Sequence, residues 1–476
     1  MIRPLLPLAA LGLLAGCSLA PEYDRPAAPV PSSWPVGDSY LRQDEAGLPT
    51  VSYRDIFHDA RLQALVEQAL ANNRDLRVAA ANIAAARGAY RSQRGALFPT
   101  ISAGASAGAS DGGVSATSAG GGTRESYAAN VGTTAFELDL FGRVRSLSRA
   151  ALDEYFATEA AARATRLALV GDIADAWLAY AADKSLLAIA EDTAKSAGES
   201  VRLTRLRLEG GIAPRTDLRQ AELVEAQAKS DLATQRTALA QDVNLLQLLV
   251  GAPIDPARLP GSIDQAAPTL AELPAGLDSG VLLRRPDVVQ AEYQLRAANA
   301  RIGAARAALF PRISLTGLVG LASNALGSLF TGDAFTWSAT GAAAYNIFDG
   351  GSARGDRAQT RAQRDAAVAS YEKAIQTAFR EVSDALARRG TIADQESAQT
   401  NLVAAAQDNY NLSTARYRGG IDTFLQSLDA QRSFYSAQRS LVATRLARAQ
   451  NLVALYRTLG GDALLDAAPD DPAAPR

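Results

Sequence analysis

The sequence has 476 residues, 48% of them apolar but only 6% aromatic, and a formal net charge of −2. This charge gives no electrostatic basis for nucleic-acid binding. One histidine, His58, and one cysteine, Cys17, leave no material for a histidine-based triad, a multi-ligand metal site or an internal disulfide. Alanine dominates the apolar residues, which favours long, closely packed helices over a core of bulky side chains.

Residues 1–16 have the layout of a secretory signal peptide, with Arg3, an apolar run and small residues before Cys17. Leu14-Ala15-Gly16-Cys17 resembles a bacterial lipobox, which implies cleavage before Cys17 and a covalent lipid on its thiol. The alternative is an ordinary signal peptide that happens to contain a cysteine. Ser18, where an aspartate would imply retention at the inner membrane, implies the outer membrane. The proline-rich stretch that follows predicts an extended strap.

From about residue 60 the sequence can be laid over itself. Asp75 matches Asp287 at an offset of 212 residues (287 − 75). Gly210-Gly211-Ile212 matches Gly419-Gly420-Ile421 at an offset of 209 residues (419 − 210). Landmarks that recur in one order at nearly one offset indicate an internal duplication of a large module.

The residue pattern of each copy predicts the same series of helices. The first ends at a Phe-Pro pair, because the residue before proline avoids helical dihedrals. A proline-free run of about 65 residues follows, which as a helix would span on the order of 100 Å. Charged residues interrupt both runs, so neither is a transmembrane helix. The predicted helices are, in chain order, 74–97, 143–209, 215–250, 287–309, 352–418 and 423–459.

Four segments alternate apolar with small polar residues and predict strands: 100–110, 127–136, 313–321 and 335–347. In the second, Tyr127, Val131 and Ala135 are expected on the apolar face. Strands of this length suit an outer-membrane barrel, whereas the alternative is a pair of hairpins in a soluble sheet. Four strands cannot close a barrel and open edges cannot face lipid, so several chains would have to contribute. Aromatic side chains near the strand ends are candidates for the membrane interface: Tyr127, Phe335, Trp337 and Tyr345.

Several motifs recur together along the chain: Leu14-Ala15-Gly16-Cys17, Arg285-Pro286-Asp287, Phe348-Asp349-Gly350-Gly351 and Arg416-Tyr417-Arg418-Gly419-Gly420-Ile421. In this combination the mature chain resembles outer-membrane efflux proteins of the TolC superfamily, in the lipidated branch typified by OprM and NodT. The resemblance implies an internally duplicated α+β membrane protein. It would form a homotrimeric channel with a twelve-stranded β-barrel, four strands per protomer, and a long periplasmic α-helical barrel.

The resemblance also implies the partners and the location. The channel would work with a periplasmic adaptor and an inner-membrane pump of the RND type, sit in the outer membrane and extend into the periplasm. It would need no cofactor beyond the lipid on Cys17. The implied segments are 1–16 signal peptide, 17–58 lipid-anchored extended strap and equatorial segment, 59–251 first repeat, 252–280 equatorial linker, 281–460 second repeat and 461–476 flexible tail.

The Gly-Gly-Ile turns are the candidate functional stretches. Asp422, Leu425 and Asp429 follow the second turn at i, i+3 and i+7, which predicts one helix face and, on a trimer axis, a narrow ring-lined pore. In the family, the positions matching Leu425 and Asp429 form the periplasmic constriction. The alternative for Asp422 is a helix N-cap, whereas Asp429 is too deep in the helix to cap it.

Four further residues are candidates for ties between neighbouring helix ends: Asp217, Arg219, Tyr410 and Tyr417. Asp217 has the alternative of stabilising a first helical turn after Pro214. The turns themselves are candidates for adaptor docking through Gly210, Gly211, Ile212, Gly419, Gly420 and Ile421. The alternative there is that glycine merely permits a positive φ at a helix end.

Two other functions compete with an export duct. A coiled-coil structural or adhesion lipoprotein would explain the long helices and the lipobox, but not two pairs of aromatic-edged strands at matching places. An enzyme is disfavoured because the sequence has no phosphate-binding loop, nucleophile elbow or metal cluster. The predicted function is therefore passive export of drugs or other small molecules to the cell exterior.

Overall fold

The computed structural model describes residues 19–35, 52–111, 123–270 and 279–461. Cys17 and the predicted signal peptide lie outside the described residues. The chain divides into two compact units, and each unit draws on both halves of the duplicated sequence. The first unit comprises the chain up to Ala27, Asn82–Glu159 and Gln290–Glu372; the second comprises Ala28–Ala81, Ala160–Val289 and the chain from Lys373 on.

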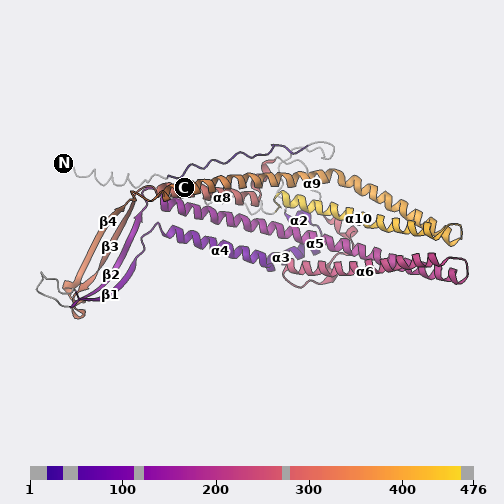
Figure 1. The fold of residues 1–476 in the computed structure, drawn as a ribbon, viewed down its shortest axis with the longest axis horizontal. Helices are drawn as coiled ribbons and strands as arrows, with labels where there is room; N and C mark the ends of the chain where they lie inside the picture. Colours follow the sequence, from indigo (N-terminus) through magenta and orange to yellow (C-terminus); the bar gives the residue numbers. More distant parts are fainter. Residues whose placement is uncertain (1–18, 36–51, 112–122, 271–278, 462–476) are drawn as a thin grey trace. The chain divides into compact units, whose positions relative to one another are not determined.

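The elements follow the predicted order (Figure 1). The longer helices are α3 (Ala60–Asn72), α4 (Arg74–Gly95), α5 (Arg143–Glu209), α6 (Arg215–Val250), α8 (Pro286–Ala307), α9 (Ser352–Arg418) and α10 (Phe424–Thr458). The short helices are α2 (Tyr53–Ile56), η1 (Pro256–Arg258), α7 (Ile263–Ala266), η2 (Ala267–Thr269), η3 (Ser279–Arg284), η4 (Leu326–Ser328) and η5 (Gly332–Ala334). The strands are β1 (Ser102–Asp111), β2 (Thr123–Leu138), β3 (Arg312–Ser323) and β4 (Phe335–Ala344).

The two proline-free runs each form one uninterrupted helix of 67 residues, α5 and α9, with the predicted bounds. The helices before the strands end slightly earlier than predicted. After α4 the chain makes a tighter turn, in which Phe98 N–H donates to the Gly95 carbonyl at 3.0 Å, and Phe310 N–H donates to the Ala307 carbonyl at 3.0 Å after α8. Within the described part of the chain, no helix combines the length and the apolar character that crossing a bilayer requires.

The first unit contains one antiparallel sheet in the order β1-β2-β3-β4 (Figure 1). Its register places apolar residues in rows on one face: Trp337 is opposite Val319, Val319 is opposite Val131, and Val131 is opposite Ala103. Thr340 and Thr316 are paired on the other face. The alternation read from the sequence therefore corresponds to two chemically different faces of one sheet.

One part of the strand prediction is wrong. The pairing of β2 with β3 shifts between Thr133 and Phe136, and Ala135 adopts a positive φ of 52°. Its N–H donates to the Thr316 hydroxyl at 3.0 Å instead of to the ladder. Because this bulge inserts an extra residue, Ala135 does not continue the apolar face, and Phe136, opposite Leu315, takes that place.

The second unit contains a core of large side chains, among them Trp177, Phe57 and Tyr456. The rings of Phe57 and Tyr456 lie 5.7 Å apart and join the segment after α2 to α10. Trp34 of the N-terminal segment stacks on Phe379 of α9, with the ring centres 5.0 Å apart. The long helices therefore do not stand alone, because aromatic contacts from the N-terminal segments and α10 cover part of them.

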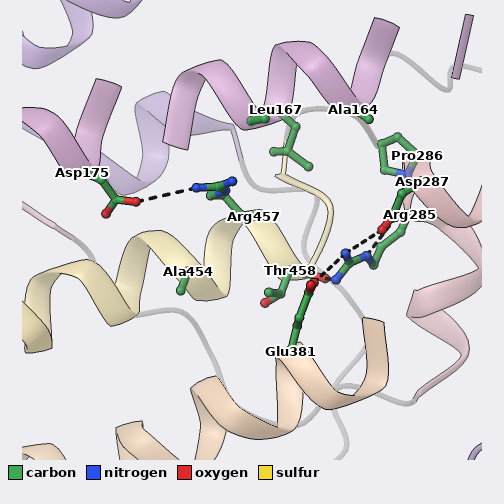
Figure 2. Close-up of a pocket in the computed structure, with 11 residues that line it drawn as sticks. Ala164, Leu167, Asp175, Arg285, Pro286, Asp287, Glu381, Ala454, Arg457 and Thr458 are labelled. Carbon is green, nitrogen blue, oxygen red and sulfur yellow. Dashed lines mark hydrogen bonds and ion pairs between the residues drawn. The ribbon is translucent and has the colours of Figure 1, made fainter. Parts of the chain in front are cut away.

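The contacts of the Arg285 side chain give the Arg285-Pro286-Asp287 motif a structural role. Its side chain is only 9% exposed. Its guanidinium donates to both carboxylate oxygens of Asp287 (3.0 and 2.8 Å), to Glu381 of α9 (2.9 Å) and to the carbonyl of Thr458 at the end of α10 (3.1 Å). Figure 2 shows these groups converging from three segments. One buried cation thus joins the start of the second repeat to its last two helices.

These groups line a pocket of about 350 Å³ (Figure 2). On its other side Arg457 pairs with Asp172 at 3.0 Å and with Asp175 at 3.7 Å. Burial raises the pKa of Asp175 to about 6, although the Arg457 charge opposes the shift. A Cβ at Gly171 would lie 2.2 Å from the Arg457 side chain, so the glycine inside α5 makes room for this arginine.

Candidate functional site

The first tip, between α5 and α6, closes with a Schellman turn. Gly211 N–H donates to the Leu208 carbonyl at 3.0 Å, and Ile212 N–H donates to the Arg207 carbonyl at 2.9 Å. Gly211 has a φ of +72°, which favours glycine. Gly210 has no such constraint. The turn leaves the Ile212 side chain 76% exposed.

The second tip, between α9 and α10, repeats this geometry. Gly420 N–H donates to the Tyr417 carbonyl at 3.0 Å, and Ile421 N–H donates to the Arg416 carbonyl at 2.9 Å. Gly420 has a φ of +74°, and the Ile421 side chain is 68% exposed. Glycine is thus required for backbone geometry at only one position of each pair, and both tips present an isoleucine to solvent.

Asp422 does not lie where the spacing predicted. Helix α10 begins at Phe424 with Thr423 as its N-cap, so Asp422 precedes the helix and neither shares its face nor caps it. Arg416 binds both Asp422 carboxylate oxygens, at 2.6 and 3.0 Å. Hydrogen bonding from Arg416 lowers the pKa of the Asp422 carboxyl. Asp422 therefore closes its own turn.

Leu425 and Asp429 do share a face of α10, four residues apart. The Leu425 side chain is 52% exposed, and Asp429 is also exposed. The Asp429 carboxylate has no hydrogen bond or ion pair with the residues that the structure describes. One apolar and one free anionic side chain are therefore available to line an opening.

Arg207 joins the two tips and was missed by the sequence reasoning. Its guanidinium donates to the Arg418 carbonyl at 3.0 Å and lies 4.4 Å from the centre of the Tyr417 ring. Arg207 matches Arg416 in the duplication (416 − 207 = 209). The position matching Asp422 is Ala213 (422 − 213 = 209), so Arg207 lacks a carboxylate in its own turn. That difference between the copies was the signal available in the sequence.

A small apolar cluster lies beneath this bridge. Tyr417 and Phe424 are buried, with their ring centres 5.4 Å apart. Residues of all four long helices at the tips build the cluster: Val201, Leu218, Ala221, Tyr417, Phe424 and Leu428. The two tips are therefore packed together as well as hydrogen-bonded.

Hydroxyl groups continue the contact away from the tips. The Tyr410 hydroxyl shares a hydrogen bond with Ser196 at 2.8 Å, and Gln431 donates to the same Ser196 at 3.4 Å. The Tyr417 hydroxyl lies 3.5 Å from the Thr204 hydroxyl. Tyr410 and Tyr417 thus bond across to α5 within one chain.

Asp217 and Arg219 behave differently from the two tyrosines. Asp217 lies in the first turn of α6, after Pro214, which is where an acidic side chain stabilises a helix. Arg219 pairs with Glu222 of its own helix at 2.6 Å. The ion pairs that cross between α5 and α6 are Arg205–Glu222, at 3.7 Å, and Arg236–Glu191, at 3.9 Å. Among the residues that the structure describes, neither the Asp217 nor the Arg219 side chain bonds directly to another helix of the same chain.

The aromatic candidates lie on the sheet as the alternation predicts, with one difference. Phe335 and Trp337 are exposed at the start of β4, and Tyr127 of β2 is opposite Ser323. Tyr345 is exposed but follows the end of β4 at Ala344. Aromatic side chains therefore occur near both ends of the last strand.

No group of histidine, cysteine, aspartate or glutamate side chains suited to holding a metal ion occurs within residues 19–35, 52–111, 123–270 and 279–461. The arrangement at the tips consists of backbone turns, arginines, hydroxyls and exposed apolar side chains. Such groups can hold two helix tips together or contact a partner protein. At the tips they supply no nucleophile with an adjacent base.

The chain is similar to known proteins over nearly its whole length. A family model described as "Outer membrane efflux protein" matches residues 65–252 and 278–461. The toluene efflux pump outer membrane protein TtgC of Pseudomonas putida is 45% identical over 465 residues, covering 97% of this chain and 96% of the relative. Outer membrane protein OprJ of Pseudomonas aeruginosa is 41% identical over 450 residues, covering 94% and 93%. The open-state structure of the Neisseria gonorrhoeae MtrE outer membrane channel has a TM-score of 0.82 at 34% identity, covering 94% and 98%.

Proposed function

The chain belongs to the outer membrane efflux protein family, and from that premise we propose that three copies of it assemble into one export duct, closed at the helix tips. The family consists of efflux channels, not enzymes, and this protein is an outer-membrane efflux channel with the expected duplicated α+β fold. The number of copies, the gate, the lipid and the partners are the proposal.

The observation that supports assembly is the open sheet. In one chain, β1 and β4 are outer strands, and each is exposed along its whole length. Unpaired strand edges cannot face lipid, so copies must pair β4 of one with β1 of the next. Three copies give twelve strands. Helix α4 supports the same assembly, because none of its 22 residues is buried in one chain.

The gate is proposed at Leu425 and Asp429. Repeated around a three-fold axis, Leu425 would form an apolar ring and Asp429 a ring of carboxylates one turn away. Rings of carboxylates favour cations, and closely spaced rings restrict width. Asp422 is left out of this gate, because Arg416 neutralises it.

The relatives' names guide the proposed partners and cargo. One relative belongs to a toluene efflux pump and another, ArpC of Pseudomonas putida, to an antibiotic efflux pump. We extend this to an inner-membrane pump of the RND type and a periplasmic adaptor that docks on the exposed Ile212 and Ile421. Small apolar molecules and antibiotics are the proposed cargo. Cys17 is the proposed lipid attachment, and Phe335, Trp337, Tyr127 and Tyr345 the proposed interface aromatics.

Planar-bilayer recording of the purified protein tests this proposal. We expect discrete conductance steps with a preference for cations, because three free Asp429 carboxylates would line the narrowest point. A protein that inserts without producing steps would contradict the duct, and steps that favour anions would contradict the Asp429 ring.

A further inference from the structure

We propose that one face of α8 is a docking track for the strap, residues 19–25, and that this track sets where the anchored end of the chain meets the membrane. The second clause rests on the proposed lipidation of Cys17. All of these residues except Cys17 are described, and those on the strap and the track belong to the first unit.

The track residues recur every three or four positions, which places them on one helix face. They are Glu292, Arg296, Asn299, Gly303 and Arg306. The strap meets them in the opposite chain direction. At one end Arg306 donates to the Leu19 carbonyl at 3.1 Å; further along, Asn299 donates to the Pro21 carbonyl at 2.9 Å.

The other end of the track is ionic. The Glu292 side chain is only 7% exposed and pairs with Arg25 of the strap at 2.8 Å and with Arg296 at 2.7 Å. Tyr23 donates to the same carboxylate at 3.3 Å, and its ring lies 5.0 Å from the Arg296 guanidinium. A buried carboxylate needs such partners, so undocking the strap would leave Glu292 with one arginine.

Length matching supports a continuous track. From Glu292 to Arg306 there are fourteen steps along α8, about 21 Å at 1.5 Å per residue. From Leu19 to Arg25 there are six steps, about 19 Å at the 3.1 Å rise of an extended proline-rich segment. The strap can therefore lie straight along the helix with each contact in register.

Gly303 makes the close approach possible. A Cβ at this position would lie 2.7 Å from the Ala20 Cβ and 2.7 Å from the Ser146 hydroxyl oxygen. Glycine inside a helix is destabilising, by about 0.5–1 kcal/mol relative to alanine. Its presence in the middle of the track is explained by the two residues that lie against it, Ala20 of the strap and Ser146 of α5.

The direction of the strap gives the track its role. Leu19 is held at the C-terminal end of α8, and β3 begins at Arg312, five residues after α8 ends at Ala307. Cys17 precedes Leu19 by two steps of the chain, a reach of at most about 7 Å. A lipid on Cys17 is thereby kept at the end of the helix where the sheet begins.

Limited chymotrypsin cleavage after Tyr23, in the full-length protein in detergent, tests the track. Gly303→Leu and the double variant Asn299→Ala/Arg306→Ala leave the cleaved sequence unchanged. We expect both to release the fragment ending at Tyr23 at least roughly tenfold faster than wild type, because cleavage follows the undocked population. Arg301→Ala is the matched control, since Arg301 pairs with Glu154 away from the strap, and should cleave at the wild-type rate.

Two results would overturn the inference. One is an unchanged cleavage rate in the double variant, which removes the hydrogen bonds that Asn299 and Arg306 donate to the strap. The other is fast cleavage in Cys17→Ser, because the lipid and not the track would then hold the strap. A palmitate label absent from Cys17 would refute the proposed lipidation alone, while slow wild-type cleavage would still support the docked strap.

Discussion

Replacing Arg285 by alanine is expected to destabilise each chain by about 3–5 kcal/mol, because it removes the hydrogen bonds that a buried cation donates to two partly exposed carboxylates and to the buried carbonyl of Thr458. Glu381 would lose this arginine, and the Thr458 carbonyl would lose its 3.1 Å hydrogen bond at the end of α10. At about 2 cal/mol/K of unfolding entropy per residue, this corresponds to a fall of roughly 3–5 °C in melting temperature. Circular dichroism of the purified protein in detergent measures it.

Arg284→Ala is the matched control, because Arg284 is exposed and precedes Arg285 directly. It should melt within about 1 °C of wild type, as surface substitutions commonly do. The melting temperature of Arg285→Lys should lie between those of Arg285→Ala and wild type. An ammonium group cannot reproduce the planar guanidinium that reaches Asp287, Glu381 and Thr458 together. If Arg285→Ala and Arg284→Ala melt alike, Arg285 does not join the three segments energetically.

Replacing Arg207 by alanine is expected to raise the open population of the channel. The variant loses a hydrogen bond to the Arg418 carbonyl and a cation–π contact with Tyr417, together about 2–3 kcal/mol if both tips must separate on opening. Every 1.4 kcal/mol lost from the closed state alone increases the open-to-closed ratio about tenfold. Single-channel recording should therefore show longer openings.

Arg205→Ala controls for loss of an exposed arginine at the same tip, because Arg205 pairs with Glu222 and not with the second tip. Its openings should match those of wild type. Asp429→Ala distinguishes the Arg207 bridge, called the latch here, from the proposed ring of Asp429 carboxylates. It should weaken the cation preference and increase the conductance while leaving the Arg207 latch in place. Openings of equal length in Arg207→Ala and Arg205→Ala would refute the latch, and unchanged conductance in Asp429→Ala would refute the gate assignment.

Long elements were predictable because their signals are local. The absence of proline over 67 residues, followed by a glycine pair, defined α5 and α9 to the residue. Alternation likewise identified the four strands. The bulge at Ala135 was not predictable, since it involves a hydrogen bond to Thr316, 181 residues away. Register and bulges depend on the partner strand, which local pattern does not specify.

At the tips, too, local features were predictable and contacts between distant residues were not. Glycine turns and exposed isoleucines follow from local backbone chemistry, and both copies show them. The spacing argument failed for Asp422 because it assumed that the helix began before this residue, whereas Arg416 holds the aspartate in the turn. Arg207 was missed because its partners, Tyr417 and Arg418, lie about 210 residues away in sequence. Comparing the two copies position by position would have marked it.

The most direct test of the account is the mass of the intact particle in detergent, measured by native mass spectrometry. The open edges of β1 and β4 and the uncovered face of α4 require more than one copy of the chain per particle. The proposed duct requires three copies, with twelve strands in the barrel. A particle of one copy would contradict the assembly, because a four-stranded sheet with two free edges cannot span a bilayer. Two copies would equally contradict a three-fold ring of Leu425 and Asp429.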